Sequence, residues 1–298
     1  MVQQTSTFSQ IIDAGPAIGR WASIAPLVTS RVCAGAAVTT NFYAVGGSGP
    51  SGISSELDAY TPSTNTWTTK APMPTARITQ VGVVNNVLYA VGGIDNTGTD
   101  LHTVEAYDPS SNAWTTKAPM PTARRGFGIG VVNGILYAIG GFSATLGTLN
   151  IVEAYNPATN AWSTVAPMPT ARYGFAVGVV NGILYAAGGA GNSILAVVEA
   201  YDPLTSTWST KASMPTARYE VTGGVLGKVM YAIGGTKDGS KSLRTVEAYR
   251  PLTNTWIRKP QMLTARYGFG AGAVNGILYV AGGANGNTFT PNAEGFDP

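Results

Sequence analysis

One pattern recurs six times along this chain and constrains its fold more than any other feature. Each copy holds the segment MPTAR or a variant of it followed by Tyr-x-x-Gly-Gly, and six tryptophans recur with the same period. Successive tryptophans lie 46 to 48 residues apart, at Trp21, Trp67, Trp114, Trp162, Trp208 and Trp256. A fixed period of this length is typical of a propeller or a solenoid, so the six copies must be interpreted as one architecture.

Composition narrows the class further. Charged residues make up only 11% of the 298 residues, whereas 38 are glycine, which favours a turn-rich β protein over a disordered chain. The chain contains no run of about 18 apolar residues that would predict a membrane helix, and its first ten residues do not resemble a signal peptide. The net charge of +3 is too small to indicate nucleic-acid binding. We therefore expect neither a membrane nor a nucleic acid as a partner.

Each copy of the pattern reads as four short strands. In the third complete copy, Asn133 and Gly134 favour a tight type I′ hairpin because both residues accept a positive φ. Turn residues follow about every ten positions, as expected for antiparallel strands. We predict strands at 124–132, 135–141, 151–155 and 161–164, with a polar loop at 142–150. Four antiparallel strands per copy make one propeller blade.

The two ends of the chain predict how the ring closes. A proline stands five residues before each tryptophan, and Pro298 has the same place with no tryptophan after it. The strand around Trp21 should therefore be the fourth strand of the last blade, which leaves no open sheet edge. The prediction is an all-β, six-bladed propeller with four antiparallel strands per blade over residues 14–298. Residues 1–13 are expected to be an N-terminal tail outside the repeat.

These motifs resemble the kelch repeat across residues 14–298. The resemblance is carried by Gly-Gly after a tyrosine-bearing strand, by the element Tyr107-Asp108-Pro109, and by the tryptophan seven residues after that tyrosine. It implies a propeller of six or seven blades, and the repeat count favours six. Kelch propellers include adaptors and scaffolds, actin-associated proteins, a copper-radical oxidase, iron-dependent specifier proteins and a sialic-acid mutarotase. The fold alone does not choose among them.

Few residues here could hold a metal or act as a nucleophile. His102 is the only histidine, which argues against an imidazole-based copper or zinc site. Cys33, the only cysteine, is expected to be buried packing. The oxygen-rich stretch at 95–100 is compatible with a hard cation but lacks the spacing of a calcium loop, so a plain turn is favoured. We predict no catalytic residue, no metal and no cofactor.

The arginine of each MPTAR segment is the main candidate for binding. Each one begins the innermost strand of a blade, so all six should surround one end of the central channel and attract anions. In some animal kelch adaptors, arginines at the matching place line a pocket for acidic peptides. The candidate ligand-binding residues are Arg31, Arg77, Arg124, Arg172, Arg218 and Arg266, together with Tyr173, Tyr219 and Tyr267, which directly follow three of them.

A structural role competes with this interpretation. A carboxylate begins the third strand at the same end of each blade, and only Gly-Gly lies on the strand between it and the arginine. An extended arginine can span the two strand spacings of about 4.8 Å, and a half-buried carboxylate needs a partner. The candidate structural partners are Asp58, Glu105, Glu153, Glu199, Glu247 and Glu294. Both roles are compatible, because a guanidinium has five donors.

We therefore expect a non-catalytic kelch binding module. Its partner would be a protein or peptide, or a small anionic ligand such as an acidic sugar, on the face that carries the arginines. The chain is expected to be monomeric. Specificity would come from the loops after the second strands, at 48–55, 94–103, 142–150, 190–196, 236–243 and 284–291. The alternatives are a mutarotase-like enzyme acting on a small acidic sugar, and a structural or designed repeat scaffold without a ligand.

Overall fold

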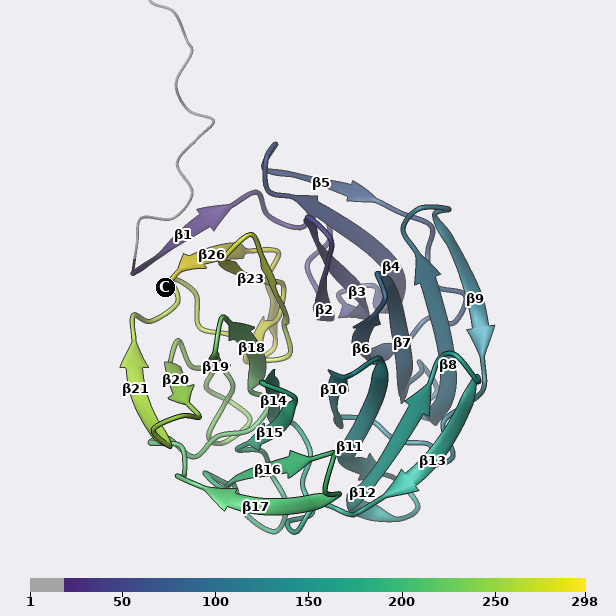
Figure 1. The fold of residues 1–298 in the computed structure, drawn as a ribbon. Helices are drawn as coiled ribbons and strands as arrows, with labels where there is room; N and C mark the ends of the chain where they lie inside the picture. Colours follow the sequence, from purple (N-terminus) through teal and green to yellow (C-terminus); the bar gives the residue numbers. More distant parts are fainter. Residues whose placement is uncertain (1–18) are drawn as a thin grey trace, which may run out of the picture.

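The computed structural model describes residues 19–298 and consists of six four-stranded antiparallel sheets arranged as the blades of a propeller (Figure 1). The first strand of each blade faces the middle of the ring, and the fourth lies at its rim (Figure 1). None of these residues is helical, so the described part of the chain contains no helix that could cross a membrane. The tail predicted at 1–13 lies outside the described residues.

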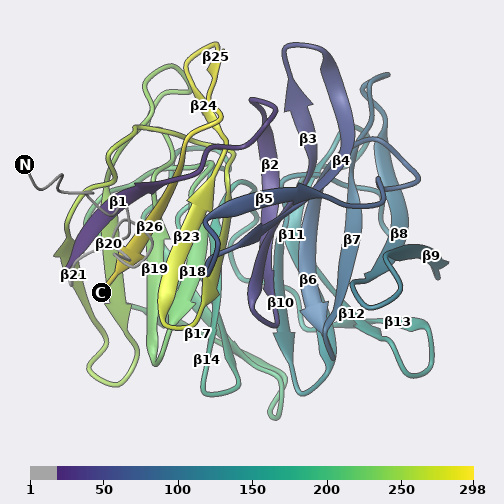
Figure 2. The ribbon, with the colours of Figure 1, turned by 90° about the horizontal axis from the view of Figure 1, so that it is seen from above.

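The blades follow one another along the chain, and the last is shared between both ends. Blade 1 holds β2 (Val32–Val38), β3 (Asn41–Gly49), β4 (Gly52–Thr61) and β5 (Thr66–Thr69), and blade 2 holds β6 (Ile78–Val84), β7 (Val87–Ile94), β8 (Asp100–Asp108) and β9 (Ala113–Lys117). Blade 3 holds β10 (Gly128–Val132), β11 (Ile135–Ser143), β12 (Gly147–Asn156) and β13 (Ala161–Val165), and blade 4 holds β14 (Ala176–Val180), β15 (Ile183–Ala187), β16 (Val198–Asp202) and β17 (Thr207–Lys211). Blade 5 holds β18 (Thr222–Leu226), β19 (Val229–Ile233), β20 (Val246–Arg250) and β21 (Thr255–Lys259), and blade 6 holds β22 (Gly270–Val274), β23 (Ile277–Ala281), β26 (Ala293–Asp297) and β1 (Arg20–Ile24). A small hairpin of β24 (Ala284–Asn285) and β25 (Thr288–Phe289) projects beyond the strands of blade 6 (Figure 2).

The N-terminal strand closes the ring as predicted. β1 pairs with β26, and Trp21 lies opposite Phe296 with the two rings stacked at 5.0 Å. The indole of Trp21 donates a hydrogen bond to the carbonyl of Pro260 at 2.9 Å, in the segment that leaves blade 5. The other five tryptophans each donate to an alanine carbonyl in the segment before their own blade. The two ends of the chain therefore reproduce the joint found between every other pair of blades.

The Gly-Gly pairs connect neighbouring blades. The second glycine of each pair donates its N–H to the carbonyl of the next blade's repeat arginine, from Gly47 to Arg77 at 2.9 Å around to Gly283 and Arg31 at 2.8 Å. These glycines need a left-handed backbone: Gly93 has a φ of +106°, and a Cβ there would come within 1.9 Å of the carbonyl oxygen of Ile78. The double glycine is thus required by close backbone packing.

The segments after Gly-Gly differ from the prediction in half of the ring. In blades 1 to 3, much of each predicted loop is paired strand, because pairing resumes beyond a bulge at the glycines. In blade 2, for example, the pairs Gly93–Leu101 and Ile94–Asp100 follow the shift after Val91. In blade 3, β11 and β12 run to Ser143 and from Gly147, which replaces most of the loop predicted at 142–150. Blades 4 and 5 keep shorter second strands and irregular loops there.

Candidate functional site

The six repeat arginines lie inside the blades. All six have no exposed surface, and each is paired with a buried carboxylate on the third strand of its own blade. The nitrogen–oxygen distances are 2.6 Å for Arg31–Asp58, 2.5 Å for Arg77–Glu105, 2.5 Å for Arg124–Glu153, 2.6 Å for Arg172–Glu199 and 2.5 Å for Arg218–Glu247, and Arg266 pairs in the same way with Glu294.

Backbone carbonyls occupy much of the remaining donor capacity of these arginines. In blade 2, the guanidinium of Arg77 donates to the carbonyls of Gly92 at 3.1 Å and Ala90 at 3.0 Å as well as to Glu105. The second carboxylate oxygen of Glu105 accepts the hydroxyl of Thr75 at 2.7 Å. Burial lowers the pKa of Arg172, the equivalent residue of blade 4, to about 10, so the contacts of the repeat arginines offset a desolvation cost. The pairs brace each blade across its second strand.

This placement corrects the expectation that the repeat arginines surround the central channel. Their side chains turn back across the glycines of their own blade, because the buried carboxylates and carbonyls lie there. In the residues that the structure describes, none of the six lines the central cavity. Anion binding by these arginines stays a prediction, and any ligand would have to reach groups that have no exposed surface.

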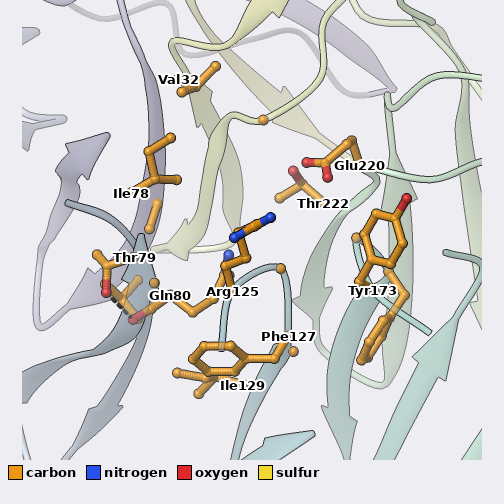
Figure 3. Close-up of a pocket in the computed structure, with 18 of the residues that line it drawn as sticks. Val32, Ile78, Thr79, Gln80, Arg125, Phe127, Ile129, Tyr173, Glu220 and Thr222 are labelled. Atoms are coloured by element: carbon orange, nitrogen blue, oxygen red, sulfur yellow. Dashed lines mark hydrogen bonds between the residues drawn. The ribbon is translucent and has the colours of Figure 1, made fainter. Parts of the chain in front are cut away.

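A cavity of about 570 Å³ lies in the middle of the ring. Five of the six residues that directly follow the repeat arginines line it, and they come from several blades (Figure 3). Val32, Ile78 and Phe127 make parts of its wall apolar. Volume and lining both fall in the range of small-molecule sites, which are mostly apolar with a few polar groups.

Arg125 brings a positive charge to this cavity. Its guanidinium donates to the carboxylate of Asp100 at 2.5 Å and lies 4.9 Å above the ring of Phe142. The Asp100 side chain is only 7% exposed and also accepts the N–H of Ala144 at 2.6 Å, so it links the hairpins of blades 2 and 3. The Arg125 side chain is 34% exposed, unlike the repeat arginines, and Figure 3 shows it extending into the cavity. It can therefore meet a ligand.

Two of the three predicted tyrosines reach the cavity. Tyr173 and Tyr267 line it, and the hydroxyl of Tyr267 donates to the carbonyl of Gly286 at 2.9 Å. Tyr219 does not line it but packs edge-on against Tyr173 at 6.2 Å. Phe142 lies 5.9 Å from Tyr173 on the other side, so an arc of aromatic rings runs from blade 3 to blade 5.

Glu220 faces the cavity from blade 5 in an unusual backbone conformation. Its φ is +50°, in the left-handed region that costs a residue with a side chain of order 1–2 kcal/mol. The equivalent residues Gly126, Gly174 and Gly268 are glycines with φ of +61°. A Cβ at Gly174 would lie 3.0 Å from Oε1 of Glu220, so that glycine leaves room for the carboxyl. Burial raises the pKa of Glu220, and within residues 19–298 no ion pair joins it to a cation.

The sequence analysis missed Arg125 and Glu220. The available signal was their departure from the repeat: Arg125 stands where three later blades have tyrosine, and Glu220 where three blades have glycine. Positions that are the same in every blade proved to support the fold. Strain at a residue that departs from its repeat is a reason to look for function there.

The residues considered from sequence as nucleophiles or metal ligands lie in surroundings typical of structural residues. His102 is exposed on β8, and the buried thiol of Cys33 donates to the carbonyl of Ala281 at 3.5 Å, with its pKa raised by burial. The carboxylate of Asp95 accepts the N–H groups of Thr97 and Thr99, which makes the turn favoured from sequence. Across residues 19–298, no three side chains of His, Cys, Asp or Glu gather as they would for a metal.

Comparison with known proteins gives the same architecture. A family model described as the KLHDC2/KLHL20/DRC7 Kelch-repeats domain matches residues 32–235, and one described as the Kelch motif matches residues 217–263 and 265–298. A search of curated proteins gave no match. A solved chain described as "Structure of YjhT" aligns with a TM-score of 0.77 and 17% identity, over 91% of this chain and 95% of that chain. At this identity the likeness shows the fold alone.

Proposed function

Because the chain belongs to the kelch-repeat family, whose propellers generally serve as interaction modules, we propose that its central cavity binds a ligand carrying an anionic group. The ligand is an acidic sugar or the acidic part of a peptide. The cavity of about 570 Å³ is large enough for either a sugar ring or a few peptide atoms. The proposal concerns this cavity and not the buried repeat arginines.

The position and partial exposure of the Arg125 guanidinium carry the proposal. It is the cavity-lining arginine whose guanidinium is partly exposed, and Asp100 and Phe142 fix its position before any ligand arrives. A guanidinium held in this way can donate two parallel hydrogen bonds to a carboxylate. Pre-organisation reduces the entropy lost on binding, so the buried Asp100 contributes to affinity without touching the ligand.

The remaining lining favours a ligand with donors beside its acid group. Glu220 accepts hydrogen bonds when ionised and would repel a ligand that carried only negative charge. A sugar acid offers hydroxyls, and a peptide offers backbone N–H groups, next to the carboxylate. The rings of Tyr173 and Tyr267 can cover the apolar face of either one.

Calorimetric titration with glucuronate and with an oligoglutamate peptide tests this proposal. The variant Arg125→Tyr places the residue of blades 4 to 6 at this position and should weaken binding about tenfold or more, as expected for a lost charge-assisted pair. The matched control is Arg20→Tyr, which removes the same charge from the exposed end of β1 and should leave binding unchanged. Binding that is equal in wild type and Arg125→Tyr would reject the cavity as the site.

Glu220 supports a second candidate function, an enzyme that interconverts the anomers of a small acidic sugar. A general acid or base works best with a pKa near the operating pH, and burial raises the pKa of this carboxyl toward that range. Glu220 also occurs in one blade only, as an asymmetric substrate requires. Proton NMR of freshly dissolved glucuronate would measure anomer exchange. Glu220→Gln should abolish any catalysis while binding persists. If wild-type protein exchanges the anomers no faster than buffer does, only the binding function is supported.

A further inference from the structure

Positive charge is concentrated on blade 5. Residues 228–259 contain seven of the 18 lysines and arginines of the chain but only two acidic residues, Asp238 and Glu247. Glu247 is buried against Arg218, and the carboxylate of Asp238 accepts the N–H groups of Ser240 and Lys241 within its own loop. The seven cations are Lys228, Lys237, Lys241, Arg244, Arg250, Arg258 and Lys259.

Three of these cations surround a hollow that is separate from the central cavity. It has a volume of about 230 Å³ and lies between the loop after β19 and the end of β21, the fourth strand of blade 5. Lys237, Arg258 and Lys259 line it with Thr245 and Gln261. Within residues 19–298 none of the three cations forms an ion pair, so their charges are free to meet a ligand.

Two of the three cations of the hollow depart from the repeat, whereas Lys259 stands where blades 1, 2 and 4 also have lysine. Lys237 occupies the place of Gly191 in blade 4, and Arg258 the place of Thr210. Arg258 pairs across the sheet with Glu247, but that carboxylate already accepts Arg218 and Thr216. The fold thus has no need of a cation at position 258, because Thr210 faces Glu199 in blade 4 in the same register.

We infer that this hollow on blade 5 is a second binding site, for a tetrahedral oxyanion such as a phosphate or sulfate group. The fork of Arg258 can bind two oxygens, and the ammonium groups of Lys237 and Lys259 supply point charges to the others. The hydroxyl of Thr245 and the amide of Gln261 add neutral donors. A compact anion fits a hollow of about 230 Å³.

Substitutions taken from the other blades test this inference with the fold preserved. The triple variant Lys237→Gly, Arg258→Thr, Lys259→Val carries the residues of blades 3 and 4 at these places. The control triple Lys70→Val, Lys117→Val, Lys211→Val removes the same charge at the ends of the fourth strands of blades 1, 2 and 4. Sodium phosphate is titrated by calorimetry at constant ionic strength. Affinity should fall about tenfold or more in the first triple and less than about twofold in the control.

Further arms identify the source of the oxyanion and the site. Sulfate, glucose 6-phosphate and a phosphoserine peptide should compete with phosphate, and the tightest one indicates whether a small molecule or a modified protein is the natural source. Arg125→Tyr should leave phosphate binding intact, which also separates this inference from the central cavity. Equal losses in the two triples, loss in Arg125→Tyr, acetate binding as tight as phosphate, or no saturation would each overturn it. If the first triple is unfolded by circular dichroism, Arg258→Thr alone replaces it.

Discussion

Blades 4 and 5 share the contacts that hold the ring together but differ in the side chains that they present to solvent and to the cavities. Both hold a buried pair, Arg172–Glu199 at 2.6 Å and Arg218–Glu247 at 2.5 Å. In both, the second glycine of the Gly-Gly pair donates to the carbonyl of the next repeat arginine, and the tryptophan indole donates to an alanine carbonyl of the preceding segment. The contacts that form the ring are therefore shared by the two blades.

The differences lie where a side chain reaches solvent or a cavity. Glu220 replaces Gly174 at the central cavity, while Lys237 and Arg258 replace Gly191 and Thr210 at the outer hollow. Each replacement adds a charge, and Glu220 also adds backbone strain. The comparison teaches that repeated positions support this fold, and that positions which depart from the repeat are where binding should be sought.

The largest expected effect comes from breaking the ring that holds both blades. In blade 4 the fourth strand, β17, follows the third strand directly along the chain, whereas in blade 6 the fourth strand is β1, from the other end of the chain. Deleting residues 1–22 removes Trp21 and exposes the edge of β26, so we predict aggregation or loss of cooperative unfolding. Size-exclusion chromatography and thermal melting would measure this. A monomer with an unchanged melting temperature would show that β1 does not close the ring.

Breaking the buried pairs should cost the two blades about the same. Arg172→Met and Arg218→Met each leave a buried carboxylate without its cation, which should lower the free energy of unfolding by about 3 kcal/mol. Urea denaturation followed by tryptophan fluorescence measures the loss. A double-mutant cycle of Arg218→Met with Glu247→Gln should give a coupling above about 1 kcal/mol. A coupling near zero would remove the bracing role and restore ligand binding as the reason for these arginines.

The sequence predicted the frame better than the site. The period, Trp21 and Pro298 were enough for six blades and their closure, because closure depends only on which positions are equivalent. The period does not say which way a side chain turns, so the repeat arginines were expected in the channel although their partners lie inside the blades. It also could not show that pairing resumes beyond Gly93, which depends on a bulge. Arg125 and Glu220 were visible only as exceptions to the repeat.

Replacing the exceptional residue of blade 5 by that of blade 4 should stabilise the protein. Glu220→Gly removes strain at a φ of +50° and a desolvated carboxylate, and should raise the free energy of unfolding by about 1 kcal/mol at neutral pH. Because the pKa of Glu220 is raised in the folded state, the cost of its charge applies above that pKa. The cost disappears as pH falls toward the unfolded value of about 4.3, so the advantage of the variant should shrink there.

Glu220→Gln separates the two contributions to that stability, since it keeps the strained backbone and removes the charge. Its stability relative to wild type should change with pH in the same window, whereas the part that only glycine gains should be independent of pH. If Glu220→Gly destabilises the protein at neutral pH, the carboxyl makes contacts in the fold that outweigh its strain. Urea denaturation at several pH values would measure both variants.

The smallest expected effect is on ligand affinity and tests whether Glu220 shares the cavity with the anion. The charged and titratable groups that line the cavity besides Glu220 are Cys33, Arg125, Tyr173 and Tyr267, and Asp100 lies behind Arg125. Because burial raises the pKa of Glu220, lowering the pH from about 8 to about 5 moves this carboxyl toward its protonated form while the sugar acid stays ionised. Removing one repulsive charge is worth about 1 kcal/mol, so glucuronate should bind roughly threefold to tenfold more tightly at the lower pH.

In Glu220→Gln the affinity for glucuronate should be high at both pH values and nearly the same between them. The same slope in wild type and variant would mean that another group titrates, and tighter binding at the higher pH would mean that ionised Glu220 accepts hydrogen bonds from the ligand and contributes more by attraction than by repulsion.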